Sequence, residues 1–149
     1  MNDGEISGAG EFHLFGDAQL VNAGNIIANK SGERFLVQSQ EGHISNNGTM
    51  SAESGGILLL NPVVIDNVEG SIVAKDNSAF EMRGGSIRGG LFASEENSFF
   101  GIPTWGGGSL EGEITNAAHF SISQRGTLLV SDDLALQGSG AIELHPNSA

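Results

Sequence analysis

Three charged residues, Asp66, Arg88 and Glu111, each come directly after an apolar residue, and they follow one another at intervals of 22 and 23 residues. Acidic and basic groups held side by side can carry out acid–base chemistry on a polysaccharide, or can bind a sugar. The same order of charges also forms an ion ladder that separates like charges. Exposed pairs of this kind contribute about 0–1 kcal/mol. We expect the structural ladder, with a sugar-binding or catalytic face as the alternative.

Trp105 is the only tryptophan, and it lies in a segment rich in Gly and Pro, residues 103–108, which predicts a protruding surface loop. An exposed indole can stack on a sugar ring or anchor a partner, but it can also fold back over the surface, which is the interpretation we favour. Asp132 and Asp133 form a carboxylate pair. The Gly-His-Gly and Arg-x-Lys motifs that accompany such a pair in pectin-cleaving hydrolases are missing, so the pair predicts a turn.

Nothing in the sequence predicts a metal or cofactor site. The four histidines belong to different repeats and lack the close spacing of metal ligands. There is no cysteine, no calcium-loop motif, and no Gly-rich phosphate loop between a strand and a helix. We therefore expect no metal, no cofactor and no enzymatic activity.

The formal net charge is −12 at pH 7 and the pI is about 4.4. A chain this acidic is a poor partner for nucleic acid or for an anionic membrane surface. The longest apolar run, Ile57 to Leu60, is too short to insert into a bilayer. The N-terminus has no signal peptide, and the first apolar repeat begins at Ile6 without a capping segment. We therefore expect a piece of a longer exported chain, with a cytoplasmic protein as the alternative.

Apolar residues recur every 20 to 24 residues in seven segments that Gly and Asn punctuate. A fixed period of this length indicates stacked units that bury a shared core. The first row of apolar residues is Ile6, Ile26, Met50, Ile72, Phe92, Ile114 and Leu134. The second row is Phe12, Phe35, Leu58, Phe80, Phe100, Phe120 and Ile142, and its partner two residues on is Leu14, Val37, Leu60, Met82, Ile102, Ile122 and Leu144. The third row is Leu20, Ile44, Ile65, Ile87, Leu110 and Leu128.

Apolar and polar residues alternate within each segment, as in Phe80-Glu81-Met82, and this period of two is typical of strands. Gly and Asn between the runs, as at Asn22 and Asn46, are expected at tight turns. The sequence therefore predicts an all-β fold, a right-handed parallel β-helix (β-solenoid) with three short strands per coil and about seven coils of 20–24 residues. We expect residues 1–149 to form one domain that is a fragment of a longer array, with each coil about 4.8 Å above the last.

Three segments, Asn22–Ala28, Asn46–Ala52 and Asn67–Ala74, are similar to the Asn-x-Gly-x-Ile-x-Ala coils of bacterial surface proteins. Those proteins are the β-helical passengers of autotransporters and the filamentous-haemagglutinin-like exoproteins. The resemblance covers nearly the whole chain. It implies an exported, surface-displayed stalk or adhesin whose partners are host or matrix glycans or proteins, and it carries over no binding residue.

The expected function is a non-catalytic structural and interaction segment, a rigid stalk or adhesin-like module that is secreted or displayed on the bacterial cell surface. Its candidate contact residues are Trp105, Asp66, Arg88 and Glu111. One alternative is a carbohydrate-active β-helix, a polysaccharide lyase or hydrolase that uses the charged face. The other is a cytoplasmic filament that self-associates through the open strand edges of its solenoid ends.

Overall fold

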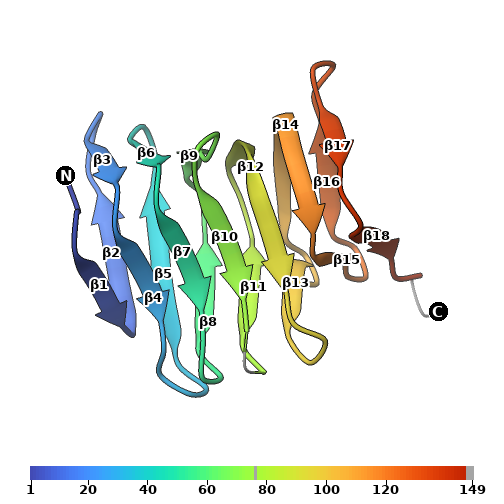
Figure 1. Ribbon diagram of the computed structural model, residues 1–149, viewed down its shortest axis with the longest axis horizontal. Coiled ribbons are helices and arrows are strands. Elements are labelled where there is room, and N and C mark those ends of the chain that lie inside the picture. The colour runs from blue at the N-terminus through green and yellow to red at the C-terminus, as the bar shows by residue number, and fades with distance from the viewer. Residues whose placement is uncertain (76, 147–149) are drawn as a thin grey trace.

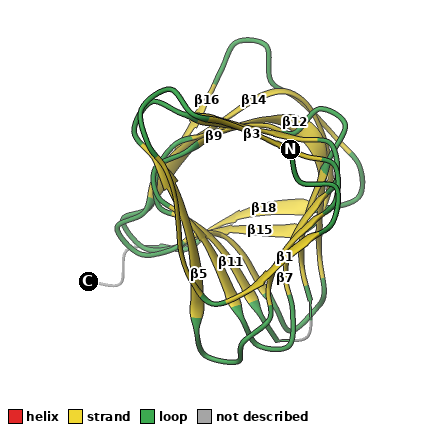
Figure 2. Cartoon of the chain, turned by 90° about the vertical axis from the view of Figure 1, so that its left-hand side faces the viewer, coloured by secondary structure: helices red, strands yellow, loops and turns green. Residues whose placement is uncertain are grey.

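The protein is described by a computed structural model, which covers residues 1–75 and 77–146 as a parallel β-solenoid of about six turns (Figure 1). Each strand pairs in parallel with the equivalent strand one coil before or after it. Figure 2 looks nearly along the rod and shows three walls of strands around the interior. The described part of the chain holds no helix long and apolar enough to cross a membrane.

The strands follow the walls in turn. The first wall contains β1 (Glu5–Gly8), β4 (Asn25–Ala28), β7 (Thr49–Ala52), β10 (Ser71–Ala74) and β17 (Ala135–Gln137). The second wall contains β2 (Gly10–Leu14), β5 (Arg34–Ser39), β8 (Ile57–Leu60), β11 (Ala79–Met82), β13 (Phe99–Ile102), β15 (His119–Ile122) and β18 (Ala141–Leu144). The third wall contains β3 (Gln19–Asn22), β6 (His43–Asn46), β9 (Val64–Asp66) and β16 (Thr127–Val130).

Two longer strands, β12 (Ser86–Ser94) and β14 (Gly107–Ala117), run from the third wall into the first. They join these two walls into one 11-stranded sheet, whereas the second wall is a separate 7-stranded sheet. The seven strands of the second wall mark the seven predicted coils, and the six rises between them make about six turns. The predicted all-β parallel solenoid is therefore confirmed.

The predicted interior rows are confirmed through the middle of the rod. Phe80 pairs with Leu58 on one side and with Phe100 on the other, and Phe100 pairs with Phe120. The ring centroids of Phe80 and Phe100 lie 4.6 Å apart, and those of Phe100 and Phe120 lie 5.8 Å apart. All three phenylalanines are buried, while the residues between inward positions are more exposed, as the alternating pattern predicts.

The first coil departs from the predicted rows by two residues. Gly10 pairs with Phe35, so the predicted partner Phe12 lies beside Val37, and Leu14 lies beside Ser39. The reason is the short corner between β1 and β2, where only Ala9 separates two glycines, Gly8 and Gly10, with φ of +129° and +122°. The equivalent corner between β4 and β5 has five residues, 29–33. Because the corner before β2 is shorter, each residue of β2 lies two positions further along the second wall than predicted.

The predicted rows are also wrong near the C-terminal end. Phe92 pairs with Asn116, whereas the predicted Ile114 pairs with Gly90 and with Leu136. The cause is an irregularity in the pairing of β12 with β14 between Arg88 and Gly90, which shifts the register. Leu134 consequently precedes β17 and does not join the first row.

The third row ends differently from the prediction. Leu110 pairs with Val130, and the predicted Leu128 pairs with Gly108. Leu128 nevertheless packs against the core, and Val130 is exposed. An added Cβ on Gly108 would lie 2.2 Å from the Cε of Met82, so the methionine fills the space beside this glycine. The interior is thus filled at this level by a side chain from another wall.

Asn22 and Asn46 were predicted at turns, and this interpretation is wrong. Both are the last residues of third-wall strands, and both are fully buried, as is Asn67 one coil later. The Nδ2 of Asn22 donates to the Oδ1 of Asn46 at 2.6 Å, and the Nδ2 of Asn46 donates to the Oδ1 of Asn67 at 2.7 Å. The asparagines therefore form an interior amide ladder along one corner of the rod.

The segment predicted as a protruding loop over residues 103–108 is partly strand. Residues 103–106 form a tight turn, closed by a hydrogen bond from the N–H of Gly106 to the carbonyl of Pro103 at 2.8 Å. Gly107 and Gly108 already belong to β14. Because Gly has no side chain, Gly108 admits the side chain of Met82 to the wall.

Candidate functional site

The charged ladder lies where the alternation predicts it. Arg88 on β12 pairs with Asp66 on β9 and with Glu111 on β14. The residues just before them, Ile65, Ile87 and Leu110, are fully buried. Asp66 and Arg88 are exposed and Glu111 is half-buried. The structure therefore brings these three residues together on the outer face of adjacent strands, about 4.8 Å apart in backbone spacing.

The side chain of Arg88 runs across Gly112, where an added Cβ would lie 3.3 Å from its Cγ. Within the described residues, no ion pair of 4.0 Å or less includes Arg88. The pKa of Asp133 is lowered mainly by a hydrogen bond from Ser131, and next by the backbone N–H of Gly112. The positive charge of Arg88 lowers it further, but more weakly. Asp133 lies in the exposed turn between β16 and β17, as predicted for this pair.

Trp105 is 71% exposed, and it stands in the turn between β13 and β14. Its backbone φ is +63°, a left-handed conformation that is uncommon for a bulky residue. Arg125, in the corresponding turn one coil later, has φ of +59°, and its Cζ lies 4.4 Å from the centroid of the Trp105 ring. The indole thus extends from the surface, with a guanidinium over one face, so the favoured prediction that it folds back over the rod is wrong.

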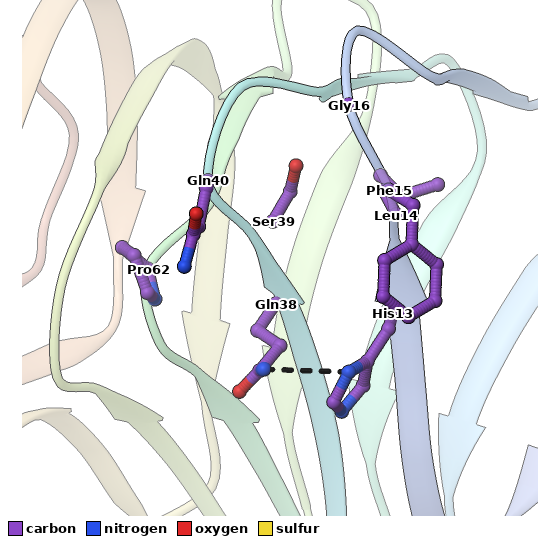
Figure 3. A pocket seen from close by; sticks show the side chains of 8 residues that line it. All are labelled: His13, Leu14, Phe15, Gly16, Gln38, Ser39, Gln40 and Pro62. Atoms are coloured by element: carbon purple, nitrogen blue, oxygen red, sulfur yellow. Dashed lines mark hydrogen bonds between the residues drawn. The ribbon is translucent and has the colours of Figure 1, made fainter.

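A hollow of about 250 Å³ lies at the corner between the second and third walls near the N-terminal end (Figure 3). Its lining includes His13, Phe15 and Gln38, with Gln40 and Pro62 opposite. The Nε2 of Gln38 lies 3.4 Å from the Nδ1 of His13, and the Nε2 of His13 lies 3.0 Å from a carboxylate oxygen of Glu11. An aromatic ring and side-chain amides therefore line the same hollow.

The charged ladder lies outside the main hollows of the described surface. Five of these hollows have volumes of about 250 to 570 Å³, and none of the five is lined by Asp66, Arg88 or Glu111. Trp105 lines none of them either. The predicted contact residues are therefore groups on an open surface, which suits contact with a macromolecule better than enclosure of a small molecule.

Three of the four histidines, His13, His119 and His145, lie beside carboxylates. The Nε2 of His119 lies 2.5 Å from a carboxylate oxygen of Glu143, and the Nε2 of His145 lies 3.9 Å from the same oxygen. Over the ranges 1–75 and 77–146, no group of three or more His, Cys, Asp or Glu residues could hold a metal ion. The surface chemistry of these residues is therefore that of hydrogen bonds and ion pairs.

Sequence reasoning missed two features of these surfaces. Arg125 follows Trp105 by 20 residues, the interval between Phe100 and Phe120, so the repeat period could have placed one above the other. The contact between Gln38 and His13 spans 25 residues, because the first coil is shifted. The predicted rows placed Phe12 beside Phe35, and that register does not bring Gln38 beside His13.

Comparison of the chain with protein-family models, with curated proteins and with solved structures found no match.

Proposed function

We propose that the chain is a rigid, non-catalytic segment of an exported bacterial surface protein, which holds contact residues at fixed intervals along a rod. The observation that carries this proposal is the continuous interior. Buried side chains stack from coil to coil, and Phe80, Phe100 and Phe120 are no more than 1% exposed. A solenoid built in this way keeps a constant rise, so its outer residues keep constant spacings.

The contact residues of the proposed module are Trp105, Asp66, Arg88 and Glu111. Trp105 contributes a large exposed aromatic surface, which is a frequent anchor in protein and glycan contacts. The ladder contributes an alternating charge pattern that a partner can match in only one register. Host or matrix glycans or proteins are the proposed partners, and the similarity of the Asn-x-Gly-x-Ile-x-Ala segments to surface β-helices supports the exported location.

Rigidity is tested by the distance between two spin labels. The chain has no cysteine, so Asn25→Cys and Thr115→Cys introduce two unique attachment points. These residues belong to one row on the first wall, four strand spacings apart, or about 19 Å between backbones. Electron–electron dipolar spectroscopy should give one narrow distribution of distances between the two labels. The control is the urea-unfolded protein, which should give a broad distribution. A broad or multiple distribution in the folded protein would contradict the proposal.

Export is tested separately on intact bacteria that produce the full-length protein. Protease added outside the cells should cleave the protein while a cytoplasmic marker stays intact. Protection of the protein until the cells are lysed would contradict an exported location.

A carbohydrate-active enzyme is the second candidate, because Arg88 lies in register between two carboxylate residues. Its test is turnover of a panel of acidic polysaccharides by the wild-type protein and by Arg88→Ala. Turnover that is lost in the variant would favour the enzyme, and a panel without turnover would favour the contact module.

A further inference from the structure

The hollow at the first corner contains a prearranged set of polar groups. The Nε2 of Gln38 carries hydrogens, so the Nδ1 of His13 acts as the acceptor in their 3.4 Å contact. The other ring nitrogen then carries the proton and donates to the carboxylate of Glu11 at 3.0 Å. This chain of contacts orients the imidazole and the Gln38 amide before any ligand arrives.

Phe15 provides the apolar side of the hollow. It is 80% exposed, and its ring centroid lies 5.9 Å from that of His13 at an interplanar angle of 44°. Figure 3 shows its ring beside His13, across the hollow from Gln40 and Pro62. A ring this exposed contributes little to the core, and its surface is therefore free to contact a ligand.

The hollow combines an aromatic surface with neutral amides, and no carboxylate, ammonium or guanidinium group lines it. A pyranose ring has the matching chemistry, because its C–H face is apolar while its hydroxyl groups both donate and accept hydrogen bonds. Gln38 and Gln40 can each donate and accept in return. The net charge of −12 and the nearby Glu11 disfavour an acidic sugar.

The size of the hollow limits how much of a glycan it can hold. Its volume of about 250 Å³ lies just below the range of about 300–1,000 Å³ for drug-sized ligands, which suits one ring better than several. The residues come from three successive coils, since His13 lies in β2, Gln38 lies in β5, and Pro62 follows β8.

We propose that this hollow binds one neutral hexopyranose ring, with Phe15 stacking on the sugar and the amides of Gln38 and Gln40 bonding its hydroxyl groups. The site lies apart from Trp105 and from the charged ladder, so it adds a ligand to the molecule beyond the contact role proposed above.

The test is NMR titration of the full chain with the methyl glycosides of glucose, galactose and mannose. Binding should be saturable for at least one glycoside, and the shifts should centre on Phe15 and on the side-chain amides of Gln38 and Gln40. Phe15→Ala should weaken binding at least tenfold, and Gln38→Leu should also weaken it. Both variants should keep the wild-type spectrum elsewhere, because Phe15 is exposed and Gln38 is only half-buried.

Leu129→Ala is the matched control, since it truncates another exposed apolar side chain on a separate part of the rod. It should leave glycoside binding unchanged. The proposal is overturned if no neutral glycoside binds, if the shifts centre on Trp105, or if methyl glucuronide or tetramethylammonium binds as tightly as the neutral sugars. Failure here leaves the spin-label distances unaffected, so the contact module is tested independently.

Discussion

The interior asparagines explain how the third wall turns into the first without leaving polar groups unpaired. Besides bonding the next amide in the ladder, the Nδ2 of Asn22 donates to the carbonyl of Thr49 at 3.3 Å, and that of Asn46 donates to the carbonyl of Ser71 at 3.2 Å. Asn67 ends the series by donating to the carbonyl of Gly89 at 3.1 Å. Aligned amides in a dry interior polarise one another, so the ladder should stabilise the corner cooperatively.

Asn46→Ala should therefore be strongly destabilising. The change removes hydrogen bonds to both ladder neighbours and leaves the Oδ1 of Asn67 without its donor in a buried place. We expect a loss of about 2–4 kcal/mol in the free energy of unfolding, measured by urea denaturation. Asn47→Ala is the control, because Asn47 is the exposed neighbour, and it should change stability by less than about 0.5 kcal/mol. Equal effects of the two changes would show that the ladder is energetically unimportant.

A second prediction concerns the charged pair on the corner between the first and second walls. The Nζ of Lys75 lies 2.8 Å from a carboxylate oxygen of Glu53, and this hydrogen bond is the main cause that lowers the pKa of Glu53, with Ser51 contributing in the same direction. A carboxyl whose pKa is lowered by folding stabilises the folded state above its ordinary pKa. That contribution is lost as the pH falls through the lowered pKa.

Lys75→Met should raise the pKa of Glu53 toward its ordinary value, as followed by NMR titration of the carboxyl carbon. The loss of stability at neutral pH should be at most about 1 kcal/mol, because both side chains are partly exposed. The difference in stability between the variant and the wild type should shrink as the pH falls through the acidic range. An unchanged pKa would mean that Lys75 does not hold the carboxylate in solution.

At the scale of the strand, the sequence was most informative where the coil corners have similar lengths. Phe80, Phe100 and Phe120 follow one another at 20 residues, and a regular period fixes both the wall and the inward face. The first coil was misplaced because Gly8, Ala9 and Gly10 replace a full corner, and a count of apolar residues does not register that change. Asn22 and Asn46 of the amide ladder were misassigned because each lies two residues before a Gly, and Asn and Gly close together are also typical of a turn.

The same reasoning explains what could be predicted of the surfaces. The order Asp66, Arg88, Glu111 was predictable because each follows an inward residue of one wall. The stacking of Arg125 on Trp105 depends on side-chain orientation in two left-handed turns, which no apolar pattern encodes. The hollow at His13 depends on the shifted first coil, so it could not be found from the predicted rows.

The phenylalanine stack offers the clearest test of wall packing. Phe100 contacts the rings of Phe80, Phe92 and Phe120 at centroid distances of 4.6, 5.3 and 5.8 Å. Phe100→Ala should cost about 3–5 kcal/mol, because it leaves a cavity in the centre of the rod. Phe15→Ala should cost less than about 0.5 kcal/mol, since that ring is exposed. Thermal and urea unfolding of both variants would check this contrast. Similar losses of stability in the two variants would show that Phe100 is not part of the core.

For the molecule as a whole, stacking along one axis makes stability close to a sum over neighbouring coils. The 20-residue unit 79–98 begins after Ser78 and ends with Ser98, and these two serines occupy the same corner position. The Oγ of Ser78 donates to the carbonyl of Ala52, and the Oγ of Ser98 donates to that of Ala74. Ala79 and Phe99, which follow them, are register partners. One coil can therefore be removed without changing the path of the chain.

Deletion of residues 79–98 should yield a folded rod that is shorter by one strand spacing, about 4.8 Å. Phe100 would then take the place of Phe80 on Leu58, because both occupy one column. The deletion also brings Asp66 beside Glu111, so we expect a modest loss of stability from like charges. Deletion of residues 80–98 is the matched control: it leaves one extra residue, which turns the inward side chains of β13 outward and should abolish cooperative unfolding. Circular dichroism and urea denaturation would compare the two proteins, and equal behaviour would contradict a core built from registered columns.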